Sequence, residues 1–177
     1  IDGGEGTDTV NFVAGTHALI AKGIEKVGVA SAAGLTTAVN FVTVDSAIAI
    51  TDSGVATTTF SNLINGTTYN STVAKETSTG DVTLKFKASE AATLNVNLTK
   101  GTSDTVTTTN VKDLTVTYGA ASAAAGNVTI DKAATNLTLN ATGDLAATGA
   151  KLAIATGAPA ADQKLETLTV TGTKAVF

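Results

Sequence analysis

Apolar and polar residues alternate along much of the chain, and this period of two predicts β-strands. Between residues 81 and 87 the pattern places Val82, Leu84 and Phe86 on one face and polar side chains on the other. Further alternations occur at Leu94, Val96 and Leu98, at Leu114 and Val116, at Val128 and Ile130, at Leu137 and Leu139, and at Leu168 and Val170. Gly, Asn, Asp and Ser separate these segments, so we expect many short strands joined by turns.

An imperfect internal repeat organises these strands. Residues 24–29 resemble residues 111–116, and residues 165–170 resemble both. Related Gly-Thr segments precede the first two copies, at 6–10 and 101–106. Recurring short strands with turns of small residues are typical of a solenoid, in which each rung covers the apolar face of the previous rung. The spacing between copies varies, so the loops must vary as well.

The sequence therefore predicts an all-β protein, an elongated parallel β-solenoid or β-helix-like stack with irregular loops. A β-sandwich of antiparallel strands is the alternative. Two Ala-rich stretches, 120–125 and 144–161, leave room only for short helical turns. The first is too short to be a stable helix, and Gly149, Gly157 and Pro159 interrupt the second.

The composition supports a thin and regular interior. Aromatic residues make up 4% of the 177 positions, and Met, Trp and Cys are absent, so the core consists of side chains that each bury little area. All eleven basic residues are Lys, and the net charge is -4. A chain without Arg or a basic stripe is not expected to bind nucleic acid. No apolar run approaches the roughly 18 residues of a membrane-spanning helix.

We also expect no enzymatic activity. The absence of Cys removes thiol nucleophiles and Cys-based zinc sites. His17 is the only histidine, and a histidine base needs a nucleophile and an oxyanion site that no motif here supplies. Glycoside cleavage needs two carboxylates at a fixed separation, and the chain lacks the aromatic platforms and Arg expected in such a site.

One segment carries a specific motif. Residues 3–11 match the nonapeptide G-G-x-G-x-D-x-U-x at each fixed position, with Gly3, Gly4, Gly6 and Asp8 in place. The glycines permit tight turns that direct backbone carbonyls inward, and Asp8 adds a carboxylate. Carbonyl and carboxylate oxygens are the ligands that calcium prefers, so we predict a Ca²⁺ site there. The simpler alternative is a Gly-rich turn in which Asp8 accepts hydrogen bonds from backbone amides.

Other acidic residues are weaker candidates. Asp2 precedes the motif directly and is included among the predicted metal ligands. Residues 101–106 read as a decayed copy with Asp104 in the acidic place, although a solvated turn is the simpler interpretation. Isolated carboxylates beside predicted strand ends, which usually cap turns, are Asp113, Asp131 and Asp144. Asp45 and Asp52 flank an apolar segment and are interpreted as strand boundaries.

Residues 1–12 resemble the calcium repeat of RTX (repeats-in-toxin) proteins, and residues 23–27 resemble the strand that follows such repeats in large secreted bacterial proteins. With its Thr, Ala, Gly, Asn and Val bias and its lack of Cys, Met and Arg, the whole chain resembles part of a bacterial surface-layer (S-layer) protein of the type I-secreted, RTX-bearing kind. The resemblance implies calcium-dependent folding outside the cell and assembly into a two-dimensional lattice. The tandem repeats of a full RTX domain are absent.

The expected function is thus structural: a secreted component of an extracellular bacterial surface layer that folds and self-assembles with Ca²⁺ at the cell surface. Its expected partners are lattice neighbours and lipopolysaccharide or other surface glycans. The alternative is a segment of a secreted RTX adhesin that binds glycans or host surfaces. We assign residues 1–22 to an RTX-like calcium-binding turn with the first rung, and residues 23–177 to a solenoid-like structural region. The chain reads as a fragment of a longer protein.

Overall fold

A computed structural model describes residues 1–72, 81–87, 92–98, 105–118, 126–130, 134–141, 152–156 and 164–172. Their regular elements are strands in two sheets. The first, the odd sheet, contains β1 (Thr9–Phe12), β3 (Lys26–Val29), β5 (Ala49–Asp52), β7 (Thr68–Ser71), β9 (Ala92–Leu98), β11 (Val111–Tyr118), β13 (Asn136–Ala141) and β15 (Thr167–Gly172). The second, the even sheet, contains β2 (Gly15–Ile20), β4 (Thr37–Thr43), β6 (Thr58–Leu63), β8 (Val82–Phe86), β10 (Thr105–Thr109), β12 (Gly126–Ile130) and β14 (Leu152–Thr156).

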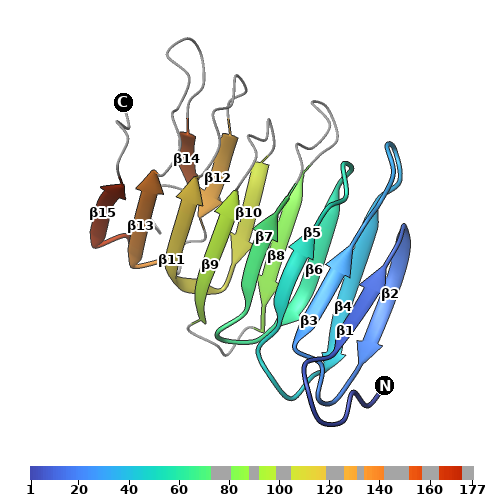
Figure 1. The fold of residues 1–177 in the computed structure, drawn as a ribbon. Coiled ribbons are helices and arrows are strands. Elements are labelled where there is room, and N and C mark those ends of the chain that lie inside the picture. The colour runs from blue at the N-terminus through green and yellow to red at the C-terminus, as the bar shows by residue number, and fades with distance from the viewer. Residues whose placement is uncertain are drawn as a thin grey trace.

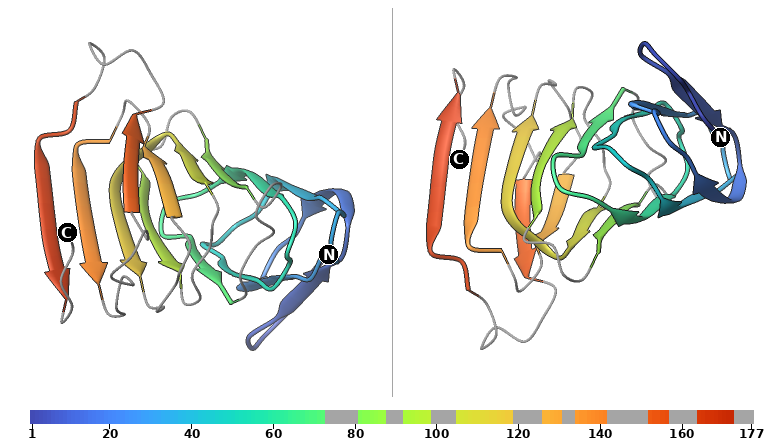
Figure 2. Two further views of the ribbon diagram at one scale, coloured as in Figure 1. Left: turned by 90° about the horizontal axis from the view of Figure 1, so that it is seen from above. Right: turned by 90° about the horizontal axis from the view of Figure 1, so that it is seen from below.

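Consecutive strands alternate between the two sheets, so the chain coils as a parallel β-solenoid (Figure 1). Within each sheet, every strand pairs in parallel with the strands that precede and follow it in the same sheet. Figure 2 shows the two sheets facing each other, with the N-terminal strands at one end of the stack and the C-terminal strands at the other. The predicted solenoid is confirmed. The antiparallel sandwich is wrong, because the ladders between all the described strands are parallel.

The rungs differ in length, as the irregular repeat predicted. In the odd sheet Val10 lies beside Val27, whereas Leu137 lies beside Leu168, so the chain between the second pair is nearly twice as long. In the even sheet Thr37 lies beside Thr58, which is an intermediate separation along the chain. A fixed strand cross-section therefore coexists with variable turns, because the extra residues are placed between strands.

The Ala-rich stretches supply no helix among the described residues. Residues 152–156 form strand β14 and pair with β12, so the expected helical turn is wrong there. Ladder hydrogen bonds override the modest helical preference of alanine. Residues 120–125 and the remainder of 144–161 lie outside the described residues.

The core is a set of stacked columns of inward side chains. Val27, Ile50 and Tyr69 occupy one column of the odd sheet, and each is at most 1% exposed. Opposite them Phe41 and Phe60 stack in the even sheet with ring centroids 6.4 Å apart, and Phe60 meets Tyr69 at 6.0 Å. These three rings form one aromatic cluster that joins the two sheets in the N-terminal half of the stack.

The register corrects one detail of the repeat. Leu114 and Leu168 share a column through Leu137, as the alignment of their segments implied. Val27, which was aligned with Leu114, instead belongs to the column of Val116, two residues further along. A shift of two residues keeps the same side chains facing inward. The similarity of the repeated segments therefore shows which side chains face the core, but it does not show which residues pair between strands.

Candidate metal centre

The Gly-rich segment before β1 forms a corner stacked on the next rung. The amide of Gly3 donates to the carbonyl oxygen of Lys22 at 2.9 Å, and the amide of Lys22 donates to the carbonyl of Ile1 at 3.0 Å. Asp2 and Lys22 form a parallel bridge. These backbone contacts hold residues 1–8 against residues 22–25, so the corner is part of the solenoid.

The motif glycines are glycine for two different reasons. Gly4 and Gly6 have φ angles of 84° and 122°, in the left-handed region that disfavours a side chain. Gly3 has no such angle, but a Cβ atom there would overlap the carbonyl oxygen of Gly23 and lie 2.8 Å from Cβ of Asp8. Gly3 therefore permits a close approach between two rungs and the Asp8 side chain.

Asp8 carries the unusual feature of the corner. Its Oδ2 atom is buried and has no hydrogen-bond partner, whereas its backbone amide donates to Oε2 of Glu25 at 2.8 Å. The backbone oxygen of Asp8 accepts from the amide of Lys26 at 3.0 Å. A buried acceptor without a partner costs about 1–3 kcal/mol, and more if it is charged. The capping alternative for Asp8 is not seen, since no described backbone amide donates to its carboxylate.

The remaining oxygens around Asp8 suit a hard cation. The Gly23 carbonyl and the Asp8 carboxylate both approach Gly3, and the Glu25 carboxylate lies within hydrogen-bond reach of the Asp8 amide. Oxygen donors of this kind, carboxylate and carbonyl together, match the preference of Ca²⁺. The donor set therefore fits the predicted metal, and the predicted ligands Asp2, Gly3, Gly4, Gly6 and Asp8 stay a prediction.

Two of the predicted ligands, Asp2 and Gly6, lie on the exposed side of the corner. Asp2 is exposed, and its Oδ1 accepts from the amide of Gly4 at 3.1 Å, which stabilises the turn locally. Gly6 is exposed as well. Within the described part of the chain no group of three or more His, Cys, Asp or Glu side chains gathers around a common point. A cation at Asp8 would consequently rely on backbone oxygens and water for much of its coordination.

Sequence reasoning missed the residues from the following rungs. Glu25 and the Gly23 carbonyl belong to the second rung. Asp45, interpreted as a strand boundary, lies between β4 and β5, and its Oδ1 accepts from the amide of Gly23 at 3.1 Å. The number of residues in each rung determines that these groups are neighbours. That number follows from the strand register, which the sequence pattern alone does not give.

The other acidic candidates do not join this corner. Asp113 lies in β11 and accepts a hydrogen bond from the side-chain amide of Asn136 in the neighbouring β13. Asp104, Asp131 and Asp144 lie outside the described residues.

Asp52 forms a second, fully enclosed polar site. It ends β5, as its interpretation as a boundary requires, yet its side chain points inward and is 0% exposed. Oδ1 accepts from the amide of Gly54 at 2.9 Å, and Oδ2 accepts from the hydroxyls of Thr58 at 2.7 Å and Tyr69 at 2.8 Å. Burial, followed by the nearby Asp52 carboxylate, raises the pKa of Tyr69 well above its usual value. Such a closed network serves packing, since substrates cannot reach it.

His17 lies beside the ring of Phe12, with centroids 4.8 Å apart, and its Nε2 is 3.2 Å from the carbonyl oxygen of Val13. These are packing contacts, and neither partner is a nucleophile. Enzymatic activity was not expected from the sequence, and that expectation stays a prediction.

Comparison of the chain with protein families, with curated proteins and with solved structures gave no significant match. None of the described segments forms a helix that is long and apolar enough to cross a membrane.

Proposed function

We propose that this protein is a structural component of an extracellular bacterial surface layer, which folds and self-assembles with Ca²⁺. The observation that carries the proposal is the buried, unpartnered Oδ2 of Asp8 inside a Gly-rich, oxygen-lined corner of a β-solenoid. A solenoid stacks similar cross-sections and so supplies a stiff building unit. The corner supplies a place where a divalent cation would stabilise the first rungs.

The proposed mechanism couples metal binding to folding. Glu25 brings a second carboxylate to the corner through the backbone amide of Asp8. Without a cation, the buried and unpartnered Oδ2 of Asp8 opposes closure of the corner. Bound Ca²⁺ would supply positive charge there, held by these carboxylates and by backbone carbonyls such as that of Gly23. Because an unfolded chain does not present this arrangement, the binding free energy adds to folding stability.

Self-assembly is supported by apolar side chains on the outside of the even sheet. Ile20 in β2 is 62% exposed and Val42 in the neighbouring β4 is 45% exposed. Solvated apolar groups of this kind favour contact with another surface. We propose that they contribute to lateral contacts between copies of the chain.

A calcium titration tests the proposal. Circular dichroism should report increased order, and light scattering should report association, as free Ca²⁺ rises to the millimolar range. Asp8→Ala should weaken both responses, whereas Asp81→Ala should leave them unchanged, because the exposed Asp81 contributes a backbone hydrogen bond far from the corner. Parent and Asp8→Ala titrating alike would show that the metal is elsewhere or absent.

A further inference from the structure

A glycine in the middle of a strand marks an unassigned feature of the outer surface. Gly28 lies in β3, between Asn11 of β1 and Thr51 of β5 in the ladder. Its φ angle is not in the left-handed region, so the backbone does not require glycine. A Cβ atom would meet only the side chain of Asn11, whose amide is free to rotate away. Glycine inside a strand weakens it, and it often marks the close approach of a ligand.

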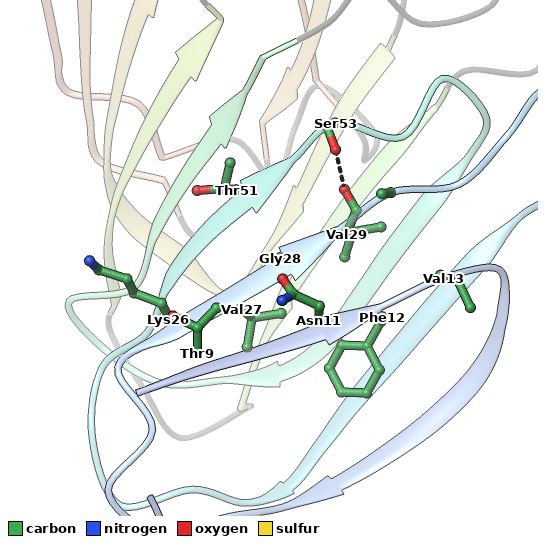
Figure 3. A pocket seen from close by; sticks show the side chains of 11 residues that line it. Thr9, Asn11, Phe12, Val13, Lys26, Val27, Gly28, Val29, Thr51 and Ser53 are labelled. Atoms are coloured by element: carbon green, nitrogen blue, oxygen red, sulfur yellow. Dashed lines mark hydrogen bonds between the residues drawn. The ribbon is translucent and has the colours of Figure 1, made fainter. Parts of the chain in front are cut away.

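The Asn11 amide takes up the space that a Gly28 side chain would fill, and a cavity lies beside this pair. A hollow of about 290 Å³ lies against Gly28 and is lined by residues from the three neighbouring strands β1, β3 and β5. Figure 3 shows Asn11 in front of Gly28, with Lys26 at one end of the hollow and Val13 at the other. The volume is at the lower limit of small-molecule sites, so the hollow suits a ligand of the size of one sugar ring.

Four of the five polar side chains that line the hollow make no hydrogen bond within the described part of the protein. The amide of Asn11, the hydroxyls of Thr9 and Thr51 and the ammonium group of Lys26 make no hydrogen bond or ion pair with the described residues. The hydroxyl of Ser53, by contrast, donates to the carbonyl oxygen of Val29 at 2.8 Å. These exposed side chains come from successive rungs and surround one hollow, so they are available to a ligand placed there.

The chemistry of the lining identifies the ligand class. An amide and two hydroxyls are suited to hydroxyl groups, and the single cation at one end is suited to an anion. Among the described residues that line the hollow, none is acidic. At the other end Val13 is 67% exposed and offers an apolar surface to C–H groups. We propose that this hollow binds one acidic sugar unit, a pyranose with a carboxylate, of a surface polysaccharide. The inference goes beyond the structural role and does not depend on calcium or on assembly.

Calorimetric titration of the full chain with glucuronate, glucose and acetate tests this proposal. A Kd on the order of 1 mM is expected for glucuronate, since a single small ligand gains limited free energy in an open hollow. Glucose should bind at least several-fold more weakly because it lacks the carboxylate. Acetate should not compete, which separates recognition of the sugar from capture of any anion.

Two variants localise the binding. Gly28→Thr would push the Asn11 amide toward the hollow, so it should weaken glucuronate binding at least tenfold. Thermal stability should change little, because the displaced atoms are the end of a flexible side chain and Thr suits a strand. Lys26→Gln should abolish the preference for glucuronate over glucose, whereas Lys85→Gln, a matched change on the outside of the even sheet, should not. Absence of glucuronate binding in the parent, or equal affinity in the parent and in a folded Gly28→Thr, would overturn the proposal. Melting curves establish that the variants are folded.

Discussion

Two aspartates in this protein, Asp8 and Asp52, have opposite surroundings. Asp8, in the N-terminal corner, has a buried oxygen with no partner. Asp52, in the core, is more deeply enclosed, yet its carboxylate accepts hydrogen bonds from Gly54, Thr58 and Tyr69. Burial alone therefore does not separate the two carboxylates. The supply of hydrogen-bond donors does, because the protein itself satisfies the Asp52 carboxylate and leaves one oxygen of Asp8 without a partner.

The comparison also separates two uses of the solenoid. The Asp52 network joins successive rungs and both sheets, since Thr58 lies in β6 and Tyr69 in β7. It fixes how these rungs lie on one another. The Asp8 corner joins the first two rungs through backbone contacts and leaves Oδ2 of Asp8 without a hydrogen-bond partner.

Removal of the Asp52 carboxylate should have the largest effect. Asp52→Ala removes the carboxylate that accepts from three buried donors, so we expect a loss of about 3 kcal/mol or more in the free energy of unfolding. Urea denaturation measures it. Asp52→Asn keeps the volume and one acceptor oxygen and should lose less. An unchanged urea midpoint for Asp52→Ala would contradict the structural role.

Alanine substitutions of the glycines beside the two carboxylates, Gly54 and Gly3, should affect different properties of the protein. A Cβ atom at Gly54 would overlap Oγ of Ser31 and lie 3.1 Å from Oδ1 of Asp52, so Gly54→Ala should cost about 1–3 kcal/mol by overpacking the core. Gly3→Ala should disturb only the packing of the N-terminal corner, because the new Cβ overlaps the backbone oxygen of Gly23. We expect its urea midpoint to change little and its calcium response to disappear. The reverse pattern would show that the corner, not the core, limits stability.

The stability difference between Asp8→Asn and the parent should change sign when calcium is added. In a chelator the variant should be as stable as the parent or more stable by about 1 kcal/mol, because a buried charged oxygen without a partner is removed. In excess Ca²⁺ the parent should gain about 2.7 kcal/mol when the free ion is roughly 100-fold above its Kd, and the variant should not. Melting temperatures with and without calcium measure both differences. Equal calcium gains would exclude Asp8 as a ligand.

The smallest effect concerns alkaline pH. The pKa of Tyr69 is raised in the folded state, so above about pH 10 the unfolded chain releases a proton that the folded chain retains. Stability should then fall as pH rises, by about 1.4 kcal/mol per pH unit at most, until the folded pKa is reached. Tyr69→Phe should remove this slope at a fixed cost of about 1 kcal/mol. Urea midpoints between pH 8 and 11 compare the two chains, and an equal slope in both would assign the alkaline loss to other groups.

The sequence by itself determined the local structure. The period of two located strands such as 82–86, identified which side chains face inward and, with the repeat, indicated a solenoid. The nonapeptide identified the Gly-rich corner and singled out Asp8. These features could be read directly because side-chain alternation and glycine conformations depend only on neighbouring residues.

Only the tertiary structure decided which residues meet between rungs. The inward turn of Asp52 and the donors around it depend on the register. So do the approach of Glu25 to Asp8, the approach of the Gly23 carbonyl to Gly3, and the hollow at Gly28. Rungs of unequal length separate such partners along the chain. A strand pattern repeats at every second position and is satisfied equally well by any even shift. The variable turns, together with the closure of each rung on the next, select one register from these alternatives.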